Sequence, residues 1–150
     1  CRSCGGIITA WASAWNADVV EYFPTIKKVD LDVPERPRVY LQQAHESLHA
    51  PAGAVMLAAS AVDSMLKLKG YVDGSLYSRI EKATTEHIIT QDMAKWAHEV
   101  RLDANDQRHA DQNAGLPTEY DAKRVIDFVS ALAEILFVLP NRVQRGLYQS

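Results

Sequence analysis

The segment RLDANDQRHA, residues 101–110, carries several groups that could perform acid–base or phosphate chemistry. Arg101, Asn105 and His109 follow one another at intervals of four residues. Because each residue of an α-helix advances by about 100°, this spacing places the three side chains on one stripe. The opposite side would carry the apolar residues of a core-facing surface, namely Met93, Trp96, Val100 and Ala104. The polar stripe is therefore a candidate site.

The residue types in this stripe suit proton transfer beside a bound phosphate. An imidazole such as that of His109 can exchange protons near neutral pH and could take the proton of a ribose 2′-hydroxyl. Arg101 could hold phosphate oxygens with two parallel hydrogen bonds, and Asn105 could orient the ribose or the phosphate. Asp63, a carboxylate within an otherwise apolar segment, could pair with Arg101.

The same residues have two other interpretations, which stay open at this point. One is a buried polar network in which Arg101 bonds Asp63 and fixes the register of two helices, because a carboxylate in an apolar helix needs a cation. On that interpretation Arg101→Ala should destabilise the fold by about 3 to 5 kcal/mol. The other is the binding of a phosphate or nucleotide without turnover.

The first residues, CRSCGG, have the form of one knuckle of a zinc ribbon. Two thiolates separated by two residues can bind one metal ion, and the glycines allow the tight backbone turn that this needs. Cys1 and Cys4 are therefore candidate ligands of a structural zinc, whose other two ligands must come from outside this sequence. The alternative is two free thiols. The next residues, GIITAWASAW, favour a short strand because they are rich in β-branched and aromatic residues.

Composition limits the possible classes of protein. A chain of 150 residues with 47% hydrophobic residues is long enough for one domain with a substantial core. The net charge of −3 and the absence of a basic aromatic patch in the sequence give no general reason to bind nucleic acid or a membrane. Asp63 interrupts the longest apolar run, so we expect no transmembrane helix. Two cysteines and no signal pattern predict a cytoplasmic protein, and a start at Cys1 suggests a fragment of a longer polypeptide.

Local patterns predict an all-α fold, an antiparallel bundle of about five helices with a short β appendage. Residues 1–37 would form the zinc-ribbon-like remnant and an extended linker, because Pro24, Pro34 and Pro37 prevent long regular structure over 22–37. Residues 38–150 would form the bundle. Its helices are expected at 39–50, at 51–70 ending near Gly70, at 75–88 after a Ser75 cap, from Thr90 through RLDANDQRHA, and at 118–139, where Pro140 ends or kinks the last helix.

Three stretches of the chain resemble a known family: residues 49–71, 100–110 and 116–140. Together they resemble bacterial domain of unknown function 4145, which occurs beside restriction and other defence-related modules. The motif is Arg, two residues, a small residue, Asn, three residues and His, here Arg101, Ala104, Asn105 and His109. Asp63 matches the acidic position of the family's second helix, and CRSCGG fits members with an N-terminal zinc knuckle.

That family is in turn similar to the HEPN superfamily of helical bundles, whose ribonucleases use an Arg and a His on one helix. Here Arg101 and His109 are further apart than is usual in those enzymes. The resemblance implies either of two functions. One is an interaction or dimerisation module of a restriction or phage-defence system, acting as a homodimer or with a protein partner. The alternative is a ribonuclease or nucleotide-binding domain that uses Arg101 and His109 at a two-fold interface. The acidic net charge favours the first, and the polar stripe favours the second.

Overall fold

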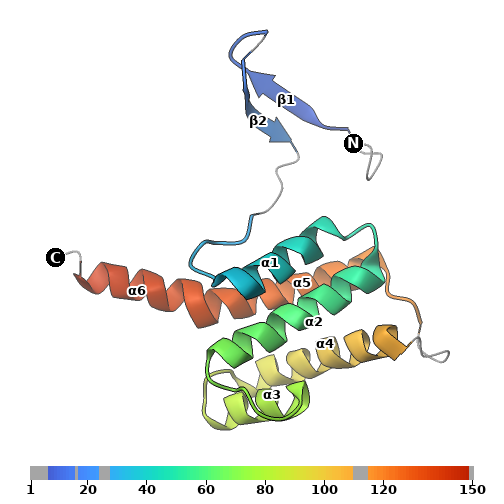
Figure 1. The fold of residues 1–150 in the computed structure, drawn as a ribbon, viewed down its shortest axis with the longest axis vertical. Helices are drawn as coiled ribbons and strands as arrows, with labels where there is room; N and C mark the ends of the chain where they lie inside the picture. The colour runs from blue at the N-terminus through green and yellow to red at the C-terminus, as the bar shows by residue number, and fades with distance from the viewer. Residues whose placement is uncertain (1–6, 16, 24–27, 110–114, 149–150) are drawn as a thin grey trace.

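The computed structural model describes residues 7–15, 17–23, 28–109 and 115–148, and in this part the chain is mostly helical (Figure 1). The elements in chain order are β1 (Thr9–Ala12), β2 (Val19–Phe23), α1 (Glu35–Glu46), α2 (Pro51–Leu68), α3 (Leu76–Thr85), α4 (Gln91–His109), α5 (Glu119–Ala133), the π-helix η1 (Glu134–Val138) and α6 (Leu139–Tyr148). Since α5, η1 and α6 join end to end, the bundle consists of five helical rods. The predicted fold class is confirmed.

Helix α2 is the centre of the bundle and contacts α1, α3, α4 and α5. Its small side chains allow this close packing, as shown by Ala54, Ala58 and Ala61, which are fully buried. The helix is apolar and long enough, by composition alone, to cross a membrane. Half of its residues are instead buried among the other helices, as expected for the core helix of a bundle.

The ends of several helices are set by the residues that the sequence indicates. Ser75 caps α3 by accepting a hydrogen bond from the backbone N–H of Ser78. Thr118 and Asp121 form a reciprocal capping box at the start of α5. Gly70, just past the end of α2, has a φ of +97°, a conformation that L side chains rarely adopt. These boundaries were predictable because each depends on residues that are adjacent in the chain.

Two expectations about the N-terminal third are wrong. Helix α1 begins at Glu35 rather than after residue 38, because Pro34 precedes it and Pro37 lies in its first turn, where no intrahelical N–H bond is lost. The segment 22–37 is also not wholly an extended linker. The second strand of an antiparallel hairpin reaches into it, with Thr9 opposite Phe23 and an irregularity between Trp11 and Ala12.

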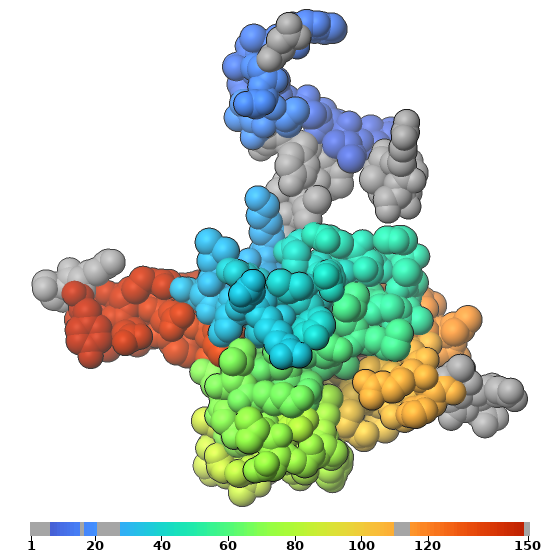
Figure 2. Space-filling model, in the orientation of Figure 1, coloured from blue at the N-terminus to red at the C-terminus, as the bar shows by residue number. Residues whose placement is uncertain are grey.

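Pro140 does not end the last helix, which passes from η1 into α6. A proline inside a helix lacks the N–H and crowds the carbonyl one turn earlier. The preceding residues form the wider π-turn η1, in which the N–H of Leu139 bonds the carbonyl of Glu134. Helix α6 then continues to Tyr148 and projects beyond the other helices (Figures 1 and 2).

Candidate functional site

A groove of about 640 Å³ opens between α1, α2, α3 and α4. Its lining includes several small side chains of the two facing helices, which leave space between the backbones: Ala59, Ser60 and Ser64 on α2 and Ala104 on α4. Larger side chains stand around them, including Tyr40 from α1 and Tyr77 from α3. The groove therefore exists because small residues line it where four helices converge.

The groove is strongly cationic although the chain as a whole is acidic. Five basic side chains line it, from all four helices: Arg36, Lys67, Arg79, Arg101 and Arg108. Asp63 is the single carboxylate among the lining residues, whereas the net charge of the chain is −3. With two tyrosines in the same lining, the groove is a basic aromatic patch, although no such patch is visible in the sequence. Its members are distant in sequence, which concealed it.

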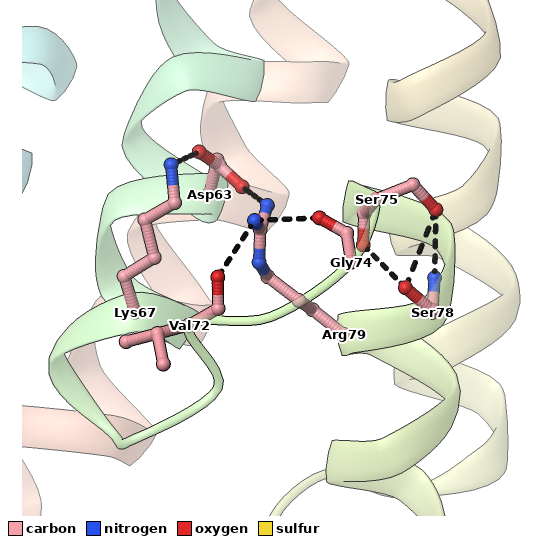
Figure 3. A network of polar contacts seen from close by, with 7 residues as sticks. All are labelled: Asp63, Lys67, Val72, Gly74, Ser75, Ser78 and Arg79. Atoms are coloured by element: carbon pink, nitrogen blue, oxygen red, sulfur yellow. Dashed lines mark hydrogen bonds and ion pairs between the residues drawn. The ribbon is translucent and has the colours of Figure 1, made fainter.

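Two of these cations are held by Asp63 (Figure 3). Arg79 donates to one carboxylate oxygen of Asp63, and the ammonium of Lys67 lies 2.6 Å from the other. The second terminal nitrogen of Arg79 donates to the carbonyl oxygens of Val72, at 3.0 Å, and Gly74, at 2.7 Å. Only 11% of the Arg79 side chain is exposed. Arg79 therefore ties the start of α3 to α2 and to the loop between them.

The predicted pair between Arg101 and Asp63 is wrong. Both oxygens of Asp63 are taken by Lys67 and Arg79, which lie on its own helix and on the next one. The guanidinium of Arg101 lies instead over the ring of Tyr77, with 5.5 Å between its central carbon and the ring centroid. The cation that pairs with Asp63 from another helix is Arg79 of α3, and not Arg101 of α4. We therefore expect the large loss of folding stability when Arg79 is removed, and not when Arg101 is removed.

The guanidinium of Arg101 lacks hydrogen-bond acceptors among the described residues. Its Nε is fully buried and finds no hydrogen-bond acceptor among the residues that the structure describes. Arg36 and Arg108 also form no hydrogen bond or ion pair within the described ranges. A buried donor without an acceptor costs about 1 to 3 kcal/mol. The groove thus holds three arginines whose donors are available to an anion.

The polar stripe of α4 is only partly assembled in this groove. Arg101 and Asn105 line it, as does Arg108, and Asn105 is exposed to solvent. His109, also exposed, is not among the lining residues. His98 is engaged elsewhere, with its Nε2 2.8 Å from Glu81 and its ring 4.7 Å from that of Tyr77. Of the four predicted site residues, Asp63, Arg101 and Asn105 come together and His109 does not join them.

The start of α3 adds to the positive character of the groove. Ser75, Leu76 and Tyr77, which are the cap and the first two residues of this helix, all line it. The first N–H groups of a helix have no intrahelical acceptor, and they carry the positive end of the helix dipole. A helix start beside arginines is a favourable place for a phosphate oxygen.

Sequence reasoning missed Arg36 and Tyr77. Arg36 lies in the first turn of α1, where the helix dipole disfavours a cation. This signal was hidden because the helix was expected to begin at residue 39, which left Arg36 in the linker. Tyr77 gave no signal in the sequence, because its role depends on the contact between α3 and α4.

Metal binding finds no support in the described part of the chain. Within it, no group of three or more His, Cys, Asp or Glu residues could hold a metal ion. The predicted zinc ligands Cys1 and Cys4 lie outside the described residues. The zinc knuckle therefore stays a prediction.

Comparison with known proteins gives one match. The family described as a domain of unknown function (DUF4145) matches residues 42–149. No curated protein and no solved structure matches the chain. The matched region contains α2 to α6 and thus most of the groove, while Arg36 and Tyr40 precede it.

Proposed function

The chain belongs to the DUF4145 family of domains of unknown function, and we propose that it binds a phosphate-bearing ligand, a nucleotide or RNA backbone, in the cationic groove. The observation that carries this proposal is Arg101. It presents a guanidinium to the groove, and its buried Nε has no acceptor among the described residues. Its terminal nitrogens form no hydrogen bond or ion pair with a described residue, so they are the donors that a phosphate in the groove would reach.

The surroundings of Arg101 suit this role. A guanidinium has five N–H donors in a planar fork and binds phosphate through two of them at once. The ring of Tyr77 beneath it limits its motion, so less entropy is lost when an anion binds. The position is therefore preorganised for an anion.

The charge balance of the groove favours a ligand with several negative charges. Asp63 partly neutralises Lys67 and Arg79, while Arg36, Arg101 and Arg108 have no carboxylate partner in the described chain. An unbalanced set of cations in a concave surface attracts polyanions, and the attraction weakens as salt increases. A polyphosphate chain or successive RNA phosphates would match this set.

The geometry supports binding more strongly than cleavage. RNA cleavage by the expected pair would require an imidazole beside Arg101, and the groove lining contains no histidine among the residues described. His109 is exposed at the end of α4, outside that lining. Binding without turnover is therefore the function that we assign, and the HEPN-like ribonuclease is the alternative that the same experiment addresses.

The test is a calorimetric titration of the full chain with ATP, adenosine and a short oligouridylate at low salt. We expect ATP or the oligouridylate to bind, adenosine not to bind, and the affinity to fall as salt is added. Arg101→Gln should weaken binding at least about tenfold, since it removes a charge-assisted contact. Arg124→Gln is the matched control, because Arg124 pairs with Glu99 and does not line the groove.

Two results would overturn the assignment. One is equal binding of ATP and adenosine. The other is equal loss of affinity in the Arg101 and Arg124 variants, which would reveal a general charge effect rather than a site. His109→Ala should bind like the wild type. If wild type cleaves the oligouridylate and His109→Ala does not, the ribonuclease alternative replaces binding without turnover.

The resemblance noted in the sequence supports a second candidate, an interaction or dimerisation module of a bacterial restriction or phage-defence system. The structural observation that favours it is α6, which carries exposed apolar residues and no buried one. A phage-plating assay comparing wild type with Arg101→Gln and Val143→Glu would show whether protection depends on the groove, on α6 or on neither. Equal protection by all three proteins would argue against a role of either feature in defence.

A further inference from the structure

Helix α6 presents its apolar side to solvent. Leu139, Val143 and Leu147 follow one another at intervals of four residues and form one stripe. They are 46%, 53% and 69% exposed. A helix of a globular protein normally turns such a stripe toward its core. In α6 the apolar stripe faces solvent instead.

The side of α6 that faces its own chain is polar. Arg145 donates two hydrogen bonds of 2.7 Å to the carboxylate of Asp32, in the loop before α1. These bonds from Arg145 are the largest cause that lowers the pKa of Asp32, and Asn141, on the same side of α6, also contributes to lowering it. Val143 lies two residues from both Asn141 and Arg145, about 200° around the helix from each. The anchoring contacts thus hold the apolar stripe outward.

The charges of α6 are balanced within the same chain. Arg142 lies 3.1 Å from Glu134, and Arg145 is paired with Asp32. These are the only charged residues between Leu139 and Tyr148. The outward surface of α6 is therefore apolar and carries no unbalanced charge. Such a surface suits a partner that is itself apolar and neutral.

We propose that this stripe binds the same stripe of a second copy of the chain, with the two α6 helices antiparallel around a two-fold axis near Val143. A neutral apolar surface is complementary to itself, as a symmetric interface requires. Gly146, beside the stripe, has no neighbouring atom within 4 Å of where a side chain would begin, which leaves room for a close approach. The projection of α6 beyond the bundle keeps the two bundles apart (Figure 2).

The size of the stripe predicts a weak dimer. The stripe consists of three partly exposed side chains on one helix, so the contact is small, and small contacts belong to weak, transient complexes. We therefore expect association in the micromolar range that depends on concentration. Because α6 lies within the residues that match the family, this contact belongs to the domain itself.

The test is sedimentation velocity of the full chain over a range of concentrations. Wild type should form dimers, and Val143→Glu should weaken dimerisation at least about tenfold by placing a charge in the apolar contact. Gln144→Glu, which adds the same charge on the adjacent side of α6, is the matched control and should still dimerise. Because α6 has no buried residue, both variants should melt like the wild type.

A second measurement identifies the partner as another α6. Residues at a two-fold axis meet their own copies, so Val143→Glu and Val143→Arg should each be monomeric and should dimerise when mixed. A monomeric wild type at about 200 μM, or no association in the mixture, would overturn the proposal. Titration of the Val143 variants with ATP keeps this result separate from the groove, which does not include α6.

Discussion

The groove contains two sets of cations that differ in what surrounds them. Lys67 and Arg79 contact the carboxylate of Asp63, and Arg79 also bonds two loop carbonyls. Arg36, Arg101 and Arg108 have no such acceptors among the described residues. The first set holds helices together, and the second is available to a ligand. In this domain the partner of a basic residue, more than its type, decides its role.

The largest effect that tests this difference is expected for Arg79→Ala. The substitution leaves Asp63, whose side chain is only 26% exposed, with Lys67 alone and removes the bonds to the loop. We expect the free energy of unfolding to fall by about 3 kcal/mol, as measured by urea denaturation. Arg124→Ala breaks an exposed pair with Glu99 and should cost less than about 1 kcal/mol. Equal costs would mean that Asp63 does not depend on Arg79.

The next effect concerns Asp121, a carboxylate that is hydrogen-bonded to Thr118 at the start of α5. Thr118→Ala removes the cap of α5 and should cost about 1 kcal/mol at neutral pH. The hydrogen bond from Thr118 is the largest cause that lowers the pKa of Asp121 below its usual 3.8. Stability from a lowered pKa is present above that value and is lost as pH falls through the folded-state pKa. The stability difference between wild type and Thr118→Ala in thermal melts should therefore shrink below about pH 4. A difference that stays constant with pH would show that the cap does not depend on the ionisation of Asp121.

A smaller effect is expected from the unpartnered arginines. The triple variant Arg36→Gln, Arg101→Gln and Arg108→Gln removes mutual repulsion but no ion pair formed with a described residue. The free energy of unfolding should change by less than about 1 kcal/mol, with any gain most visible at low salt. Urea denaturation at two salt concentrations measures this. A large loss of stability would place these arginines in the same class as Arg79.

The smallest effect concerns a carboxylate without an adequate partner. Burial is the largest cause that raises the pKa of Asp103, and the nearby Arg124 only partly opposes it. A raised pKa means that the ionised form is less favourable in the folded protein, so its penalty grows as pH rises from below 3.8 through the folded-state pKa. Asp103→Asn should be slightly more stable than wild type at pH 7 and equal to it near pH 3. Lower stability of the variant at pH 7 would contradict this.

Sequence reasoning recovered the features that depend on neighbouring residues. The cap at Ser75, the end of α2 near Gly70 and the start of the last helix near residue 118 are local features. The spacing of Arg101, Asn105 and His109 predicts one stripe of α4, of which Arg101 and Asn105 line the groove. The partner of Asp63 could not be found in this way. It depends on where α3 crosses α2, and periodicity within one helix contains no information about that crossing.

Helix α1 and the hairpin show a second limit of the same reasoning. The prolines predict a break before residue 38, but Pro37 is compatible with the first turn of α1 and is buried there. The strand Val19–Phe23 exists as part of a pair, so its signal lies partly in β1. Features that need two segments at once were the ones that single-segment patterns missed.

The π-turn η1 fixes the rotational phase of α6 relative to α5. A π-turn holds more residues per turn than an α-helix, so it acts like one inserted residue within an otherwise regular rod. Deleting one residue from 134–138 would turn everything after it by about 100° and shift it by about 1.5 Å. Arg145 would then leave Asp32, and the outward stripe would rotate onto a different side of the rod. A single insertion or deletion at this point would therefore redirect the helix, and it would also displace Leu136, Phe137 and Val138, which η1 contributes to the core.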